Sequence, residues 1–102
     1  MTEPLPKVWL QSQFVVRSVD GLHARPAIKL SQLARQFVSA IQVRSTGDQQ
    51  WVDAKSVAKL MGLRIQGGKI IEVRACGDDA GTVIASISGF FENDLAGENE
   101  GA

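Results

Sequence analysis

The residues best suited to chemistry in this sequence lie in one short segment, GLHARPA, at residues 21–27. Its histidine, His23, is the only histidine in the chain. Pro26 is typical of a first helical turn, where the missing N–H of proline has no consequence. We therefore expect a helix from Pro26 onward, with His23 directly before it. Arg25 adds a guanidinium that binds two phosphate oxygens at once.

The start of a helix is a ready site for an anion, because unpaired N–H groups and about half a positive charge gather there. The same positive field disfavours a charged imidazolium, so we expect the His23 ring to be neutral and nucleophilic. A neutral imidazole beside an oxyanion site accepts a phosphoryl group and stabilises the dianion that it then carries. The segment therefore fits phosphohistidine chemistry.

Other interpretations of His23 remain open at this point. A lone histidine at a loop–helix junction is commonly a surface residue or a capping side chain. A metal site is not expected, because one histidine and one cysteine do not assemble the common zinc ligand sets. A Ser–His–Asp hydrolase needs a serine and an acid beside His23, and no residue spacing sets that geometry.

Length and composition indicate one ordinary globular domain. The chain has 102 residues, 44% of them apolar and 22% charged, and Cys76 is its only cysteine. A single cysteine permits no internal disulfide and fits a reducing cytoplasm. The first residues lack the pattern of a secretion signal, and no run approaches the roughly 18 apolar residues of a membrane span. We expect a cytoplasmic protein without membrane insertion.

Charge is balanced overall but unevenly distributed along the chain. Residues 7–74 hold all eleven basic side chains, whereas residues 75–102 hold six acids and no base. A neutral domain is a poor binder of nucleic acid, because that affinity scales with the charges neutralised. The uneven distribution indicates steering toward a partner with an acidic patch. Scattering of these charges over the folded surface is the alternative.

Hydrophobic periodicity predicts strands and helices in turn. Apolar residues alternate over residues 8–16, 41–45 and 71–75, and a Thr-Gly-Asp turn leads into a short strand at residues 50–53. Helical spacing follows Pro26 and recurs over residues 57–63 and 83–91, with Ser56 and either Asp78 or Asp79 as N-caps. This order suits an α+β layer, a four-stranded, mostly antiparallel sheet with three helices on one face. We expect flexible tails at residues 1–7 and 95–102 around a domain at residues 8–94.

The segment GLHARPA, followed about thirty residues later by AKSVAKLMGL, resembles the HPr family of histidine-containing phosphocarriers of the phosphotransferase system. The resemblance runs over residues 8–94 and implies a βαββαβα open-faced sandwich and no cofactor. The stretches HARPAIKL, GGKIIEV and SGFFEND are similar to the nitrogen-related branch, NPr.

The resemblance implies a role for each matching residue. His23 is the phosphoacceptor on its δ nitrogen, Arg25 and the backbone N–H groups near Ala24 and Arg25 hold the phosphoryl group, and Pro26 starts the helix. Ser56 matches a position that a regulatory kinase phosphorylates in some branches. The residues alone indicate instead that Ser56 is an N-cap, worth about 1 kcal/mol.

The resemblance also implies partners. Enzyme I, charged by phosphoenolpyruvate, phosphorylates His23, which passes the group to an enzyme IIA protein. The predicted docking face is basic and apolar, and its residues are Lys29, Lys55, Val57, Lys59, Leu60, Met61 and Arg64. We expect the chain to be a monomer without turnover of its own. Ala58 departs from the family, which often has a bulky apolar residue there.

Two alternatives remain beside the carrier. A regulatory adaptor would bind a kinase, transcription factor or transporter through the same surface, with phosphorylation of His23 or Ser56 switching its affinity. A small phosphate-handling enzyme would instead turn over phosphoesters unaided. A pull-down comparing wild type with His23→Ala tests the adaptor, and turnover by the protein alone tests the enzyme.

Overall fold

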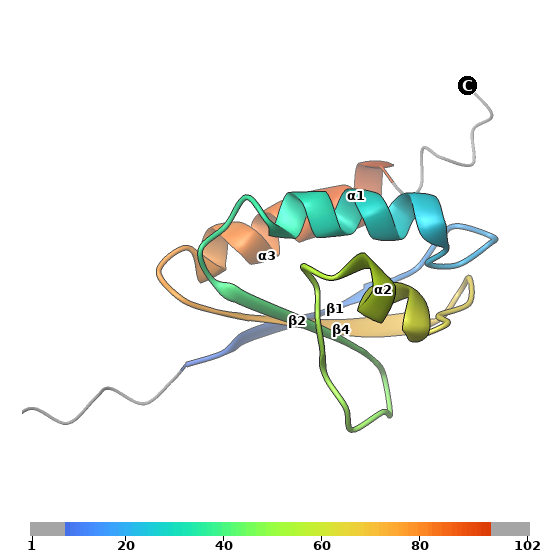
Figure 1. The fold of residues 1–102 in the computed structure, drawn as a ribbon, viewed down its shortest axis with the longest axis horizontal. Helices are drawn as coiled ribbons and strands as arrows, with labels where there is room; N and C mark the ends of the chain where they lie inside the picture. Colours follow the sequence, from blue (N-terminus) through green and yellow to red (C-terminus); the bar gives the residue numbers. More distant parts are fainter. Residues whose placement is uncertain (1–7, 95–102) are drawn as a thin grey trace, which may run out of the picture.

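The structure is a computed structural model that describes residues 8–94, so the predicted tails at residues 1–7 and 95–102 lie outside the described residues. Strands and helices follow the predicted order (Figure 1). They are β1 (Leu10–Val15), α1 (Ala24–Ala34), β2 (Ala40–Ser45), β3 (Val52–Asp53), α2 (Val57–Gly62), β4 (Ile70–Cys76) and α3 (Ala80–Gly89). None of the helices in this part of the chain is long and apolar enough to cross a membrane.

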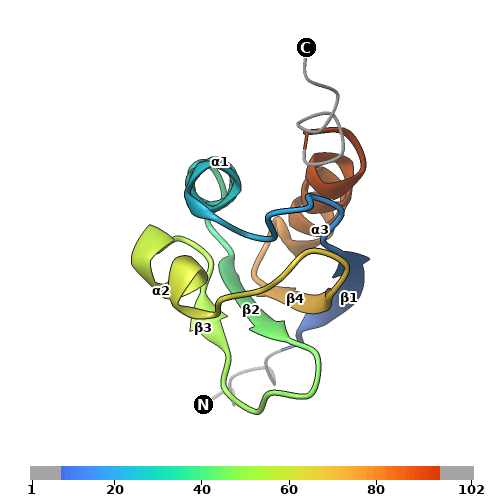
Figure 2. The ribbon, with the colours of Figure 1, turned by 90° about the vertical axis from the view of Figure 1, so that its right-hand side faces the viewer.

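The four strands form one sheet in the order β1-β4-β2-β3, and every neighbouring pair is antiparallel. The register places Ile71 of β4 opposite Phe14 of β1, and Val73 of β4 opposite Val43 of β2. The three helices lie on the same side of the sheet, α1 and α3 next to each other and α2 beside α1 near β3 (Figure 2). The predicted open-faced α+β sandwich is confirmed.

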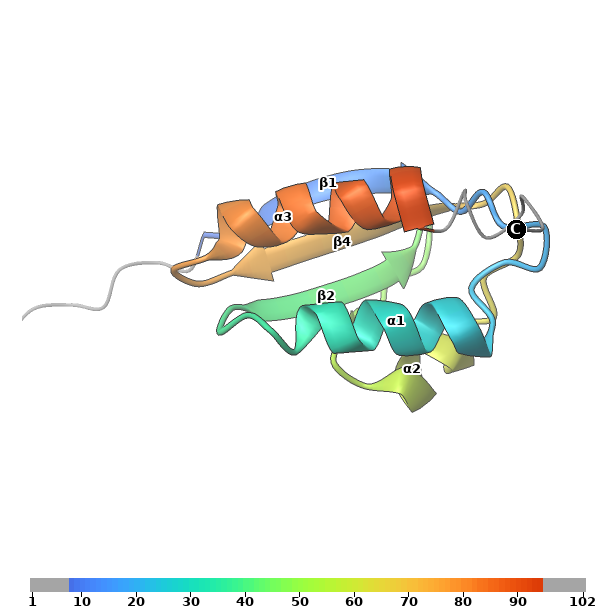
Figure 3. The ribbon, with the colours of Figure 1, turned by 90° about the horizontal axis from the view of Figure 1, so that it is seen from above.

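The core lies between this face of the sheet and the helices. Alternating strand residues point into it because successive side chains of a strand face opposite sides. Seen from above, α3 lies over β1 and β4 while α1 lies on the β2 side (Figure 3). The fully buried residues include Val16, Ala27, Leu30, Ile41, Val43, Leu60, Ile71, Val73, Val83 and Ile87.

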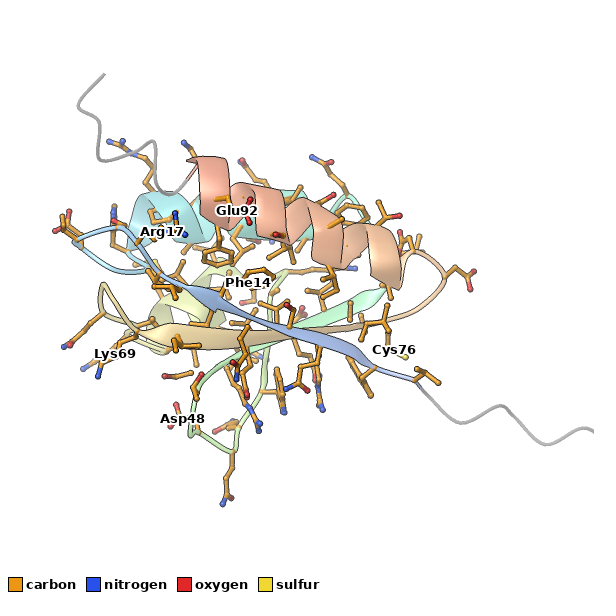
Figure 4. All side chains as sticks on the ribbon, turned by 180° about the vertical axis from the view of Figure 1, so that it is seen from behind. Phe14, Arg17, Asp48, Lys69, Cys76 and Glu92 are labelled. Atoms are coloured by element: carbon orange, nitrogen blue, oxygen red, sulfur yellow. The ribbon has the colours of Figure 1, made fainter. Side chains whose placement is uncertain are left out.

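The first strand is shorter and less covered than the alternation predicted. Val8 and Leu10 share a face with Phe14 and Val16 in the pattern, but Val8 is 66% exposed and Leu10 is 42% exposed. Helices cover only the second half of β1, where Phe14 lies beneath α3 (Figure 4). The two residues therefore do not contribute to the core.

The last helix changes its geometry before it ends. The apolar spacing predicted one helix through Phe91, but the α-helix ends at Gly89 and a π-helix follows, Phe90–Asp94. Phe91 stacks on Phe14 with ring centroids 5.2 Å apart, and Phe90 meets Phe91 edge-on. Both phenylalanines are buried, so the wider last turn closes the core over β1.

Asp79 is the N-cap residue of α3, but its side chain does not cap the helix. Its carboxylate accepts hydrogen bonds from the backbone N–H groups of Val38 and Ser39, each at 3.0 Å, and from the Ser39 hydroxyl. The prediction of a capping side chain is therefore wrong for Asp79. The carboxylate instead ties the loop before β2 to the start of α3.

Candidate functional site

His23 is the N-cap residue of α1. Its backbone is extended, its carbonyl oxygen accepts a 3.0 Å hydrogen bond from Ala27 N–H, and its side chain makes no capping bond. The first turn of α1 carries no acidic residue. The interpretation of His23 as a capping side chain is therefore wrong, and the positive end of the helix is not neutralised by a carboxylate of its own first turn.

The helix begins two residues earlier than the proline predicted, at Ala24. Pro26 is the third helical residue and is buried, and it has no N–H to donate. Of the first three helical residues, only Ala24 and Arg25 therefore have a backbone N–H group to donate. Both residues are exposed. This end of α1 therefore has exposed donors where the anion site is predicted, and anion binding there stays a prediction.

Two loops meet backbone to backbone beside His23. Leu22 N–H donates a 2.9 Å hydrogen bond to the Ile65 carbonyl oxygen, which joins the loop before α1 to the loop after α2. A second bond, from Gly68 N–H to Val16 O at 2.7 Å, holds the two loops where they leave β1 and approach β4. Figure 1 shows both loops and the start of α1 at the same end of the molecule.

Between these loops lies an open pocket of about 570 Å³. The loop before α1 contributes Val19, Asp20, Leu22 and His23, and the end of α2 with its following loop contributes Met61, Arg64, Ile65, Gln66 and Gly67. His23 is half-buried and lies on the wall of this open pocket. Within residues 8–94, no group of three or more His, Cys, Asp or Glu side chains could hold a metal ion.

The structure brings some of the predicted docking residues to His23. Met61, 42% exposed, and Arg64 line the same pocket as His23. Leu60 is fully buried in the core, so the prediction that it contacts a partner is wrong. The reason is that α2 is amphipathic and turns Leu60 inward. Lys29, Lys59 and Arg64 are exposed, and Val57 is half-buried.

Lys55 lies beside the second half of α1, away from His23. Its ammonium donates a 2.9 Å hydrogen bond to the Phe37 carbonyl oxygen, beyond the last turn of α1. Its own carbonyl oxygen accepts from the Ser31 hydroxyl at 2.9 Å and from Arg35 Nε at 3.0 Å. Lys55 therefore joins α1 to the segment before α2, and its role in docking a partner stays a prediction.

Ser56 is the N-cap of α2, as its position predicted. Its hydroxyl oxygen accepts a hydrogen bond from Lys59 N–H at 3.3 Å. This confirms the capping role. Phosphorylation of Ser56 stays a prediction.

Two polar residues of the pocket escaped the sequence analysis. Asp20 was visible only as part of an Asp-Gly turn, and Gln66 only as the residue before two glycines. Both line the pocket with His23. The Asp-Gly turn and the two glycines were the available sequence signals. The pairing of the two loops is a long-range contact, which local sequence patterns do not encode.

A half-buried histidine at the N-terminus of a helix, carried on an antiparallel open-faced sandwich, is the arrangement expected for a small histidine phosphocarrier. The family model for the PTS HPr component phosphorylation site matches residues 10–93. The phosphocarrier protein HPr of Xylella fastidiosa (strain 9a5c) is 36% identical over 84 residues, which are 82% of this chain and 92% of that protein. The chain belongs to the HPr family and acts as a phosphocarrier of a phosphotransferase system.

Solved structures agree with this assignment. HPr-C-His from Thermoanaerobacter tengcongensis matches with a TM-score of 0.78 and 32% identity, over 86% of this chain and 96% of that one. An HPr dimer from the same organism matches with a TM-score of 0.65 and 36% identity, over 74% of this chain and 84% of that one. The first match covers both chains almost fully, so the likeness extends over the whole domain.

Proposed function

We propose that His23 is the residue that carries the phosphoryl group, on its Nδ1 atom. Enzyme I donates the group and a histidine of an enzyme IIA protein receives it. The observation that carries this proposal is the position of His23 at the uncapped N-terminus of α1, on the wall of an open pocket. His23 is also the only histidine in the chain, so no other imidazole competes for the role.

The transfer exchanges one nitrogen–phosphorus bond for another. The bond from the donor histidine to phosphorus breaks as the bond from His23 Nδ1 forms, and the electron pair of the broken bond returns to the donor ring. The second transfer repeats this exchange with His23 as the donor. Neither step needs a cofactor, and positioning with charge stabilisation accounts for the catalysis.

The start of α1 supplies part of that charge stabilisation. Backbone N–H groups of Ala24 and Arg25 at a helix N-terminus favour a dianion through hydrogen bonding and through the helix dipole. The Arg25 guanidinium lies on the same exposed first turn and adds a positive charge. Phosphorylation therefore places the new negative charge at the positive end of α1.

The docking face in this proposal consists of Lys29, Val57, Lys59, Met61 and Arg64. These residues combine exposed cations with apolar surface, and Met61 and Arg64 line the pocket of His23. Such a face fits a partner with an acidic patch. Raising the salt concentration should therefore slow transfer through slower association. The proposal keeps the exchange in the cytoplasm, which fits the free Cys76 thiol.

Three finer points stay predictions: that the chain is a monomer, that a serine kinase acts on Ser56, and that the chain belongs to the NPr branch. One similar solved structure is a dimer, and light scattering on the purified protein tests the first point. A regulatory adaptor role for the same surface also stays a prediction.

The proposed function is tested by incubation with phosphoenolpyruvate and enzyme I, followed by intact-mass spectrometry. Wild type should gain one phosphate that acid removes, and His23→Ala should gain none. His23→Gln is the matched variant, because it keeps a polar side chain of similar reach. A phosphate found on either variant would contradict the proposal.

A further inference from the structure

Arg64 has an unusual backbone for its residue type. Its φ is +53°, and it is the one non-glycine residue with positive φ in the described chain, residues 8–94. It follows Leu63, the C-cap of α2, where helices commonly place glycine because a Cβ is unfavourable in the left-handed region. Backbone strain of this kind gathers at functional sites.

The strained residue lies in the pocket of His23. Arg64 is the one lysine or arginine among the residues that line this pocket in the described chain, and Asp20 is the one carboxylate. A phosphoryl dianion on His23 would meet the negative charge of Asp20 there. A cation in the same pocket offsets this repulsion, and Arg64 is in place to supply it.

The pairing of the two loops holds Arg64 in this position. Arg64 N–H donates to the Met61 carbonyl oxygen at 3.1 Å, and the next residue, Ile65, accepts from Leu22 N–H beside His23. Arg25, by contrast, lies on the exposed first turn of α1 and is not among the residues lining the pocket. Of these two arginines, Arg64 is therefore the one that lines the pocket of His23.

We propose that Arg64 contacts the phosphoryl group during transfer to and from His23, as a second guanidinium beside Arg25. Arg64 donates hydrogen bonds to the phosphoryl oxygens and exchanges no proton or covalent bond. This inference rests on the proposed function. The left-handed backbone makes Arg64 less stable than a glycine would be at this position. This loss of stability is the cost of placing a cation there.

The test uses phosphoramidate, a small phosphoryl donor, so that docking of a protein partner plays no part. Arg64→Gly should raise the Tm by about 4 °C or more, because the strain is relieved. It should slow phosphorylation of His23 by about tenfold or more, as expected for loss of a charged hydrogen bond. Arg64→Asn, which tolerates the left-handed region, should show the same slowing, and Arg64→Lys should recover part of the rate.

Lys69→Gln is the matched control, since Lys69 is an exposed cation of the same loop that does not line the pocket. Its rate should equal that of wild type. A rate for Arg64→Gly within twofold of wild type would overturn the inference, as would equal slowing in Lys69→Gln. Slowing by Arg64→Gly with enzyme I but not with phosphoramidate would also overturn it, because Arg64 would then act in docking. Failure of wild type to accept phosphate from either donor would overturn the proposed function itself.

Discussion

Gly21 packs directly against Ile65: a Cβ built at Gly21 would lie 2.1 Å from the Ile65 carbonyl oxygen. The φ of Gly21 is +73°, so a side chain here would also be strained. This close approach lets Leu22 reach Ile65 with its hydrogen bond and places His23 beside the loop after α2. The pocket thus depends on the absence of a side chain at Gly21.

Replacing Gly21 with alanine should destabilise the fold and slow phosphorylation of His23. Gly47→Ala is the control, because Gly47 also has positive φ, +96°, but a Cβ there meets nothing within 4 Å. Gly47→Ala should cost about 1 kcal/mol from strain alone, and Gly21→Ala should cost clearly more because backbone atoms must move. Urea unfolding measures both. Equal losses would show that the contact with Ile65 has no energetic role.

Asp79 should make stability depend on pH in the acid range. The pKa of Asp79 is lowered chiefly because its carboxylate accepts the Ser39 hydroxyl, and further by the N–H groups of Val38 and Ser39. A folded-state pKa below the unfolded one, about 3.9, gives a contribution that is fully present above that pH. It is lost as the pH falls through the folded-state pKa.

The free energy of unfolding of wild type, measured from pH 7 down to pH 2, should therefore fall below about pH 4. Asp79→Asn should be less stable at neutral pH and should lose less on acidification. Asp78→Asn makes the same charge change at the exposed neighbour and should keep the wild-type slope. Identical slopes in all three proteins would contradict the role of Asp79.

Ser56 should matter to stability through its cap. Ser56→Ala should lower the free energy of unfolding by about 1 kcal/mol, because Lys59 N–H loses its acceptor. Ser56→Asn keeps a capping oxygen and should retain most of the stability. Thermal and urea unfolding measure the difference. An asparagine variant as unstable as the alanine variant would show that the hydroxyl does not cap α2.

The outer face of the sheet should be stabilised by stacking in place of a second layer. The Arg74 guanidinium lies 4.3 Å from the Trp9 ring and 4.2 Å from the Trp51 ring, and Arg44 lies 4.3 Å from Trp51. Arg44 also pairs with Glu72 and lowers its pKa through a side-chain hydrogen bond. Cations over aromatic rings thus cover part of the sheet face that no helix covers.

A double-mutant cycle of Trp51→Ala and Arg74→Ala should give a coupling of about 0.5–1 kcal/mol in the free energy of unfolding. The same cycle with Trp51→Ala and Lys69→Ala should give a coupling near zero, because Lys69 lies in the loop before β4 and the cations over the Trp51 ring are Arg44 and Arg74. Coupling in the second cycle equal to that in the first would assign the effect to net charge.

Periodicity predicted most of the fold because burial on one face leaves a local trace in the sequence. The alternation of Ile71, Val73 and Ala75 marked β4, and all three are fully buried. The same reasoning failed for Val8 and Leu10, because whether a helix covers that part of β1 depends on where α3 begins after β4. It also failed for Leu60 as a docking residue, because the residue type does not distinguish an apolar side chain in the core from one on an exposed docking surface.

The sequence by itself determined the candidate reactive group, His23, and the helix start beside it, because a lone histidine shortly before Pro26 is local information. Only the tertiary structure decided which side chains share a pocket with it. Loops far apart in the chain pair through Leu22 and Ile65, and this contact brings Arg64 to His23. The reason is physical: hydrogen bonds between distant backbones, and a turn in the left-handed region, leave no periodic signal in the residues that make them.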